Sequence, residues 1–182
     1  MATTRENKTI SQFKSQLIGG GARPNLFEVE LTTLPAGIAW PADNFRYMCK
    51  AAQLPASVIA NIDIPFRGRI FKVAGDRTIE PWSITIINDE DFRIRKAMEE
   101  WVDRIAKLEN NLGATDPSAY MVNAKVFQLG RGATPSSSTN AGDRNSVLRE
   151  YEFIDIFPTS VSSIDLSYDS SDTIEKFTVV FA

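Results

Sequence analysis

The stretch FRGRIFKVAGDRTIEPWSITIIND, residues 66–89, decides the predicted fold because it holds two strand-like runs of different character. The run 66–73 has bulky apolar side chains at both alternating sets of positions, whereas the run 82–87 alternates large apolar and smaller polar residues. A strand covered on one face alternates in this way, and a strand covered on both faces does not. We therefore expect 82–87 to lie over the protein's own core, and 66–73 to face a partner as well as that core. The dipeptide Gly75-Asp76 is expected to form the turn between them.

An amphipathic helix is predicted directly after this stretch, at about residues 90–108. Asn88 or Asp89 is expected to cap it, and the acidic residues that follow suit the positive end of the helix dipole. Its apolar side chains recur at helical spacing and should pack on a sheet. The stripe consists of Ile94, Met98, Trp101, Val102, Ile105 and Leu108.

Most of the remaining chain reads as short strands. Alternating apolar residues and bounding turn residues predict strands at 25–31, 45–52, 121–129, 147–157, 163–169 and 174–182. With the two runs above, this makes about eight strands and one helix. The predicted fold class is therefore mainly β, a β-sandwich or β-barrel with one flanking α-helix.

The expected domain organisation is a single β-barrel domain at 22–182, preceded by a flexible N-terminal arm at 1–21. Apolar residues at near-helical spacing in the arm indicate a short docking helix, and Gly19-Gly20-Gly21 reads as a hinge. Two stretches, 35–44 and 130–146, are expected to be loop insertions because they are rich in proline, glycine or serine.

The connection 54–65, LPASVIANIDIP, is predicted to be a loop because prolines stand near both ends. Its apolar content is too high for a loop in free solvent. Two interpretations stay open: the loop folds onto the protein's own core, or it is buried against a neighbouring subunit. The residues concerned are Val58, Ile59, Ile62 and Ile64.

Composition excludes several classes of function. The chain has 182 residues, no histidine, one cysteine and a formal net charge of −3. Catalytic triads and metal sites that need histidine cannot form, and no intrachain disulfide is possible. The acidic balance argues against non-specific DNA binding. Cys49 is expected to be a small buried apolar residue. No catalytic, cofactor-binding or metal-binding residues are predicted, so the sequence indicates a structural or binding protein and not an enzyme.

Several segments, in order along the chain, resemble the major tail tube protein family of contractile-tailed (myovirus) bacteriophages. They are ARPNLFEVE (22–30), CKAAQLPA (49–56), VAGDRT (73–78), the Trp82/Ile84 pair, FPTSV (157–161) and TIEKFTVVFA (173–182). The resemblance implies a subunit that forms hexameric rings, which stack into the inner tail tube of the virion. Implied partners are further copies of the chain, the tail sheath protein outside, and baseplate and tail terminator proteins at the ends. Phage DNA would pass through the channel without specific binding.

Within that implied architecture, strands 45–52, 66–74, 121–129 and 147–157 are expected to build the inner barrel, each with one face on the subunit core. Alternation then predicts which polar side chains face the channel. They are Arg46, Lys50, Lys72, Asn123, Lys125, Glu150 and Glu152. The connection 54–65 is expected to join one ring to the next.

Two other interpretations remain open from the sequence. One is the tube protein of a phage-related contractile injection or secretion system. The other, of a different class, is a monomeric β-barrel that binds oligonucleotides or sugars. That class needs exposed aromatic side chains among basic residues on one sheet face, and the alternation here places most aromatic residues inward.

Overall fold

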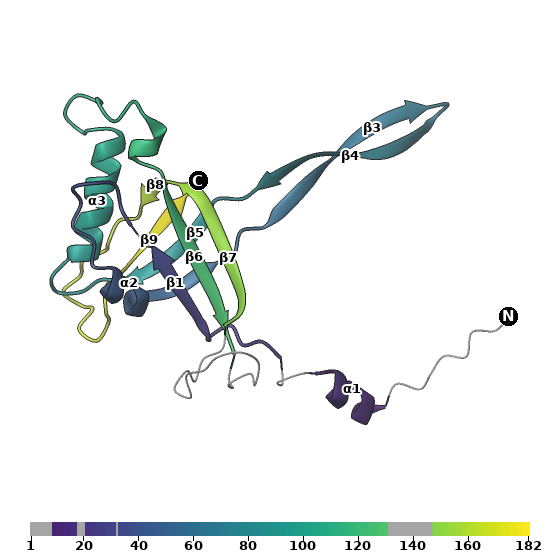
Figure 1. Ribbon diagram of the computed structural model, residues 1–182, viewed down its shortest axis with the longest axis horizontal. Coiled ribbons are helices and arrows are strands. Elements are labelled where there is room, and N and C mark those ends of the chain that lie inside the picture. Colours follow the sequence, from purple (N-terminus) through teal and green to yellow (C-terminus); the bar gives the residue numbers. More distant parts are fainter. Residues whose placement is uncertain (1–8, 18–20, 32, 131–146) are drawn as a thin grey trace. The chain divides into compact units, whose positions relative to one another are not determined.

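The structure is a computed structural model that describes residues 9–17, 21–31, 33–130 and 147–182. The predicted insertion at 130–146 lies almost wholly outside these residues. The described chain is mainly β, as expected, with strands in three sheets (Figure 1). The chain divides into two compact units, one of residues 1–28 and 125–151 and the other of residues 29–124 and 152–182.

The largest sheet has the strand order β2-β5-β9-β8 and lies in the second unit. Its strands are β2 (Cys49–Gln53), β5 (Trp82–Ile87), β8 (Pro158–Val161) and β9 (Lys176–Phe181). A three-stranded sheet has the order β1-β6-β7, with β1 (Phe27–Leu31), β6 (Val122–Leu129) and β7 (Val147–Ile156). The third sheet is the two-stranded hairpin of β3 (Ser57–Phe66) and β4 (Arg69–Ile79).

The core of the second unit forms where β5 and β9 pair. Trp82, Ile84 and Ile86 are buried at alternate positions of β5, as their spacing predicts. Their cross-strand neighbours in β9 are Phe181, Val179 and Phe177, which are also buried. Three apolar cross-strand pairs therefore hold this sheet face together.

Helix α3 (Arg93–Ile105) packs against this core through Ile94, Met98 and Trp101 of the predicted stripe. Leu108, also predicted for the stripe, lies beyond the helix and is 96% exposed. Trp101 is fully buried, its ring centroid lies 5.8 Å from that of Phe181, and its indole N–H donates to the Tyr120 carbonyl at 2.7 Å. The helix begins later than residue 90 because Phe92 has φ of +52°, which is not helical. It ends at Ile105, so the predicted boundaries at 90 and 108 were too wide.

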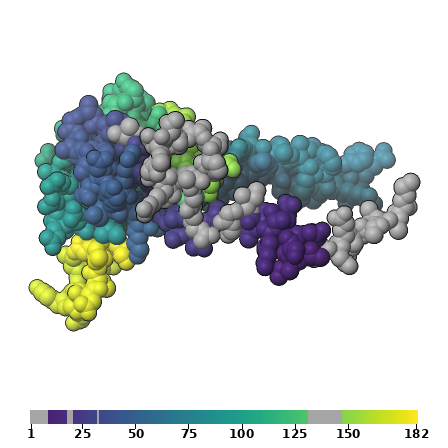
Figure 2. Space-filling model, turned by 60° about the horizontal axis from the view of Figure 1, so that its bottom comes forward, coloured from purple at the N-terminus to yellow at the C-terminus, as the bar shows by residue number. Residues whose placement is uncertain are grey.

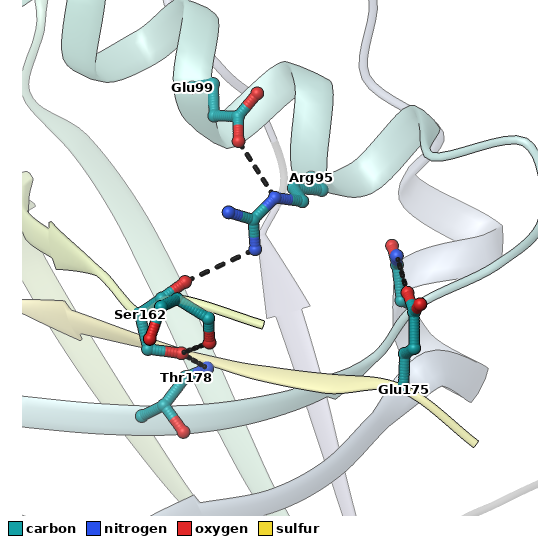
Figure 3. A network of polar contacts seen from close by, with 7 residues as sticks. Arg95, Glu99, Ser162, Glu175 and Thr178 are labelled. Carbon is teal, nitrogen blue, oxygen red and sulfur yellow. Dashed lines mark hydrogen bonds and ion pairs between the residues drawn. The ribbon is translucent and has the colours of Figure 1, made fainter. Parts of the chain in front are cut away.

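A polar network ties α3 to the strands (Figure 3). Arg95 forms an ion pair with Glu99 at 2.8 Å, and its guanidinium also donates to the Ser162 carbonyl. The Ser162 hydroxyl accepts the Thr178 N–H of β9 at 2.9 Å. The guanidinium lies over the Phe177 ring at 5.3 Å, so one side chain joins the helix, the end of β8 and β9.

Four sequence predictions of secondary structure were wrong. The predicted strand 45–52 is helical up to Met48: α2 (Ala42–Met48) follows Pro41, and β2 starts at Cys49. Alternation was misleading there, because Phe45 is buried whereas Tyr47 is 83% exposed. Residues 163–169 form no strand, since the neighbour of β9 on that side is β8.

The third error concerns 54–65, which is mostly strand and not loop. Residues 57–66 form β3, and a two-residue turn at Arg67-Gly68 joins it to β4. Both turn residues have positive φ (+47° and +80°), as tight hairpin turns that match strand twist require. Gly75-Asp76 is therefore not the turn between strands.

Gly75 and Asp76 instead form a β-bulge inside β4. The register pairs Asn61 with Ala74 and Ile59 with Arg77, so two residues of β4 stand opposite Ala60 alone. A Cβ atom at Gly75 would lie 3.1 Å from the Ala60 carbonyl oxygen. The close approach of the two strands at the bulge therefore explains why a residue without a side chain stands at position 75.

The first unit contains helix α1 (Ile10–Gln16), which agrees with the short helix expected in the arm. Thr9 and Gln12 form a capping box at its start. Elsewhere in this unit the Leu129 N–H donates to the Leu26 carbonyl at 2.9 Å. In the described part of the chain, no helix has the length and apolar character needed to span a membrane.

Candidate assembly surface

The β3–β4 hairpin has one face that is almost wholly apolar. Side chains alternate along a strand, so the pairings Ile62–Val73, Ile64–Phe71 and Phe66–Arg69 place these residues on the same face. Val58 joins them, two pleats back from Ile62. We call this set the apolar face; it comprises Val58, Ile62, Ile64, Phe66, Phe71 and Val73.

The opposite face of the hairpin is mixed. Asp63 stands opposite Lys72, and Arg77 stands opposite Ile59 and donates to the Ser57 hydroxyl. Ile70 and Ile79 lie among these polar groups. A partner on this side would meet charges of both signs, whereas a partner on the apolar face would meet only hydrocarbon apart from Arg69 and Thr78.

Both faces of the hairpin are open to solvent. Every residue of β3 is exposed, and so is every residue of β4 except Gly75. Phe66 and Phe71 are 66% and 67% exposed. Figure 2 shows the hairpin, coloured blue to teal, as a rod of side chains that projects from the rest of its own unit. The expectation that strand 66–74 packs one face on the subunit core was therefore wrong.

This exposure costs free energy in water. Burying a side chain such as Phe or Ile stabilises by about 1.5–3 kcal/mol, and an isolated two-stranded hairpin is marginal on its own. Soluble monomers seldom expose six large apolar side chains side by side, and such surfaces mark protein–protein contacts. The apolar face is therefore the strongest candidate functional surface in the described chain.

Sequence reasoning identified part of this surface. Val58, Ile59, Ile62 and Ile64 were predicted to meet another ring, and all four are exposed in β3, three of them on the apolar face and Ile59 on the mixed one. The aromatic residues Phe66 and Phe71 were missed as members of the same surface. The signal was present, because alternation continues in step on both sides of Arg67-Gly68.

The strands expected to form one inner barrel are distributed over all three sheets. Residues 49–53 belong to the four-stranded sheet, 69–79 to the hairpin, and both 122–129 and 147–156 to the three-stranded sheet. Among the predicted channel residues, Arg46 lies in α2 and pairs with Glu30 at 2.5 Å. Its prediction as a strand residue was wrong.

The other predicted channel residues are strand residues. Lys125 and Glu150 form an ion pair at 2.7 Å. Asn123 accepts the Asp155 N–H through its side-chain oxygen at 3.1 Å, and Glu152 is exposed in β7. The ion pair balances the charge of Lys125, so this pair adds little positive potential for a polyanion to bind.

Two lysines approach each other on the four-stranded sheet. Lys50 of β2 and Lys176 of β9 flank β5, and the hydrogen bond to Lys176 together with its charge lowers the pKa of Lys50. Both side chains are exposed. Lys72 is also exposed, on the mixed face of the hairpin.

The described residues offer neither a metal-binding cluster nor a reactive thiol. They contain no group of three or more histidine, cysteine, aspartate or glutamate side chains that could hold a metal ion. Cys49 is buried as predicted, and burial raises the pKa of its thiol to about 12. A protonated, enclosed thiol is a poor nucleophile.

Comparison with known proteins decides the family. A family model described as "Phage tail tube protein" matches residues 22–182. The chain belongs to the phage tail tube protein family. Among tail tube proteins of known phages, gp19 of Enterobacteria phage T4 is 34% identical over 164 residues, which cover 90% of each chain. The tail tube protein of Serratia phage KSP90 is 24% identical over 173 residues, covering 93% of this chain and 91% of that protein.

Solved structures agree on the fold of this tail tube protein. A chain of the anti-feeding prophage baseplate aligns with a TM-score of 0.61 at 10% identity, covering 89% of this chain and 91% of that one. A chain of the anti-feeding prophage cap aligns with a TM-score of 0.56 at 16% identity, covering 100% and 93%. The predicted family, the mainly β fold and the role as a structural tail tube protein of the phage virion are confirmed.

Proposed function

We propose that the chain assembles into hexameric rings that stack into the inner tube of a contractile tail, with phage DNA passing through the channel. The observation that carries this proposal is the exposed apolar face of the β3–β4 hairpin. In this proposal residues 22–182 are the tube domain and residues 1–21 are an arm. The role is structural and not enzymatic.

The apolar face supports stacking between rings. A hairpin with solvent on both faces contributes little to the stability of its own subunit, so its exposed side chains are explained by contacts made after folding. The six side chains of the apolar face are contiguous across two strands. A second copy of the chain is always available at the growing end of a homopolymer, and it can supply an apolar surface to this face.

Open sheet edges support closure into a ring. In the four-stranded sheet β2 and β8 stand at the two ends of the strand order, and in the three-stranded sheet β1 and β7 do so. Exposed edges invite pairing with other chains, and a closed ring of subunits removes them. Edge-to-edge pairing between neighbours would therefore give each ring a continuous lining.

A channel for DNA must have a hydrophilic lining that binds phosphate groups only weakly. Affinity for DNA rises with each phosphate that a lysine or arginine neutralises. We propose that Lys50, Lys72, Asn123 and the Lys125–Glu150 pair face the channel. Glu150 beside Lys125 and Asp63 opposite Lys72, together with the net charge of −3, keep the binding weak. Arg46 and Glu152 remain candidates for the same surface.

The ends and outside of the tube require other partners. We propose that the tail sheath protein surrounds the tube, and that baseplate and tail terminator proteins close its ends. An injection or secretion device could use the same assembly, and it would be distinguished by tubes that release protein in place of DNA.

Size-exclusion chromatography with negative-stain electron microscopy of the purified protein tests the assembly. We expect six-fold rings or stacked tubes at high protein concentration. A compact monomer at every concentration would overturn the proposal and favour the monomeric β-barrel.

Thiol labelling of assembled tubes tests the channel assignment separately. In Lys72→Cys and Glu150→Cys tubes, a small maleimide that can enter the channel should react, whereas a polymer-linked maleimide should not. Equal reaction with both reagents would place these positions outside the channel. Cys49 provides an internal control, because its buried thiol should stay unmodified in every tube.

A further inference from the structure

A second apolar surface, separate from the hairpin's apolar face, lies where the hairpin leaves the sheets of the second unit. It is a groove of about 390 Å³. Trp82 stacks on Phe153 of β7 within it, with ring centroids 4.5 Å apart. Ile79 and Ile154 line it and are 67% and 65% exposed. The described part of the second unit covers only a minor part of each of these two side chains.

The groove has an acidic rim. Glu80, Glu152 and Asp155 line it, and all three are exposed. Among the described residues that line the groove, no lysine or arginine is present. An apolar floor with only negative charge at the rim selects an occupant that is apolar on one side and basic beside it.

The N-terminal arm carries that combination. Helix α1 has an apolar stripe of Ile10, Phe13 and Leu17 at helical spacing, and all three are exposed. Within residues 1–17 the arm has three basic residues, Arg5, Lys8 and Lys14, against one acidic residue, Glu6. The charge of this segment is thus opposite to that of the groove rim.

Helix α1 is too short to be stable in water by itself, so another surface must cover its apolar side. It has seven residues and none is buried, although a capping box begins it. Isolated helices shorter than about 12–15 residues are marginal in water, so such a helix is held by packing of its apolar side. A cavity of about 150 Å³ accepts a benzene ring. The groove therefore has room for two or three side chains such as those of the stripe.

We propose that α1 of a neighbouring copy docks its apolar stripe into the groove between Trp82, Ile79 and Ile154, with the acidic rim facing Lys14 of that helix. This inference rests on the proposed tube assembly, which places many copies side by side. Each subunit then holds its neighbour through the arm in addition to the hairpin. Tethering by the arm raises the effective concentration of the other contacts.

Crosslinking between two single variants tests the inference. Leu17→Cys and Ile154→Cys chains are mixed, assembled and treated with a short bis-maleimide. Leu17 is at the end of the stripe, so Ile10 and Phe13 stay in place, and the buried thiol of Cys49 gives no background. We expect a crosslinked dimer in the mixture. Ser15→Cys, which places the thiol on the opposite side of α1, is the matched control and should crosslink several-fold less.

Each other outcome has a definite meaning. A chain that carries both Leu17→Cys and Ile154→Cys is treated in parallel; if it crosslinks within single chains while the mixture of single variants gives no dimer, the arm occupies its own groove and the inference is wrong. If normal tubes form without any Leu17–Ile154 crosslink, the inference also fails while the proposed function stands. If the unmodified protein forms no rings or tubes, the proposed function itself fails.

A charge reversal provides a second test that keeps the apolar floor intact. Glu80→Lys removes one rim carboxylate and should lower the crosslinking rate by about fivefold at low salt, and by less at high salt, because screening weakens the attraction. Glu109→Lys makes the same change of charge at an exposed position away from the groove and should leave the rate unchanged. Equal rates for both variants would contradict the role of the rim.

Discussion

Replacing Ile62 by aspartate tests whether the hairpin joins one ring to the next. Ile62 lies in the middle of the apolar face, opposite Val73 and between Val58 and Ile64. It is 53% exposed in the subunit, so its substitution leaves the core between β5 and β9 untouched. We expect Ile62→Asp to give a folded subunit that does not extend tubes.

The exposed fraction of Ile62 gives the size of the expected loss in association free energy. Full burial of an isoleucine side chain is worth about 1.5–3 kcal/mol, so the half still exposed contributes about 1 kcal/mol per contact. A carboxylate left in the same contact without a partner adds a desolvation cost of several kcal/mol. Together these weaken each contact by about 3 kcal/mol or more, which is at least about a hundredfold in the association constant. Free energies of unfolding should change by less than about 1 kcal/mol, since the position is exposed in the subunit.

Electron microscopy and sedimentation of assembled protein measure tube formation, and urea unfolding measures the subunit. Asn61→Asp is the control, because it adds the same charge one residue away on the mixed face, where a polar side chain already stands. We expect tubes from Asn61→Asp and none from Ile62→Asp at equal concentration. Tubes of normal length from Ile62→Asp would refute the assignment of the apolar face to ring stacking.

Three further predictions concern the subunit itself. Cys49 should react with a thiol reagent at about pH 8 only after unfolding, because a thiol with a pKa of about 12 is protonated there; rapid reaction of the native protein would show that the site is open. Trp101→Ala should lower the free energy of unfolding by about 3–5 kcal/mol in urea titration, since it empties the contact between α3 and Phe181 and leaves the Tyr120 carbonyl without its indole donor. A loss below about 1 kcal/mol would mean that α3 repacks. Glu150→Gln should change that free energy by less than about 1 kcal/mol, because the ion pair with Lys125 is partly exposed; a larger loss would indicate a buried pair.

The sequence predicted best those elements in which the apolar side chains of one face pack on the protein's own core and the polar side chains of the other face meet solvent. The alternation of 82–87 and 177–181 predicted which side chains face the core, and both sets pair with each other as buried residues. The stripe of α3 was likewise predicted because a helix that covers a sheet must bury one side. In each case one face meets the protein's own core and the other meets solvent.

The prediction of secondary structure failed in the β3–β4 hairpin, where neither face of the strands packs on the subunit core. The prolines near both ends of 54–65 indicated a loop, and Gly75-Asp76 indicated a turn, yet the chain reverses at Arg67-Gly68. Glycine serves a bulge as well as a turn, and local sequence does not distinguish them. Residues 45–48 were misassigned for another reason: alternation over only a few residues fits a helical turn as well as a strand.

Residue order and alternation within single elements were enough to predict the family, the mainly β class and the inward-facing side chains of β5 and of β9, although not that these two strands pair. The register of β3 against β4 became known only from the folded chain. That register gathers one set of apolar side chains on a single exposed face: Val58, Ile62, Ile64, Phe66, Phe71 and Val73. The physical reason is that a side chain's face depends on which residue stands opposite it, and a bulge changes that correspondence along the strand. Both faces of the run 66–73 are exposed in the subunit, so its bulky side chains have no core of their own, and we propose that a second copy of the chain covers the apolar face.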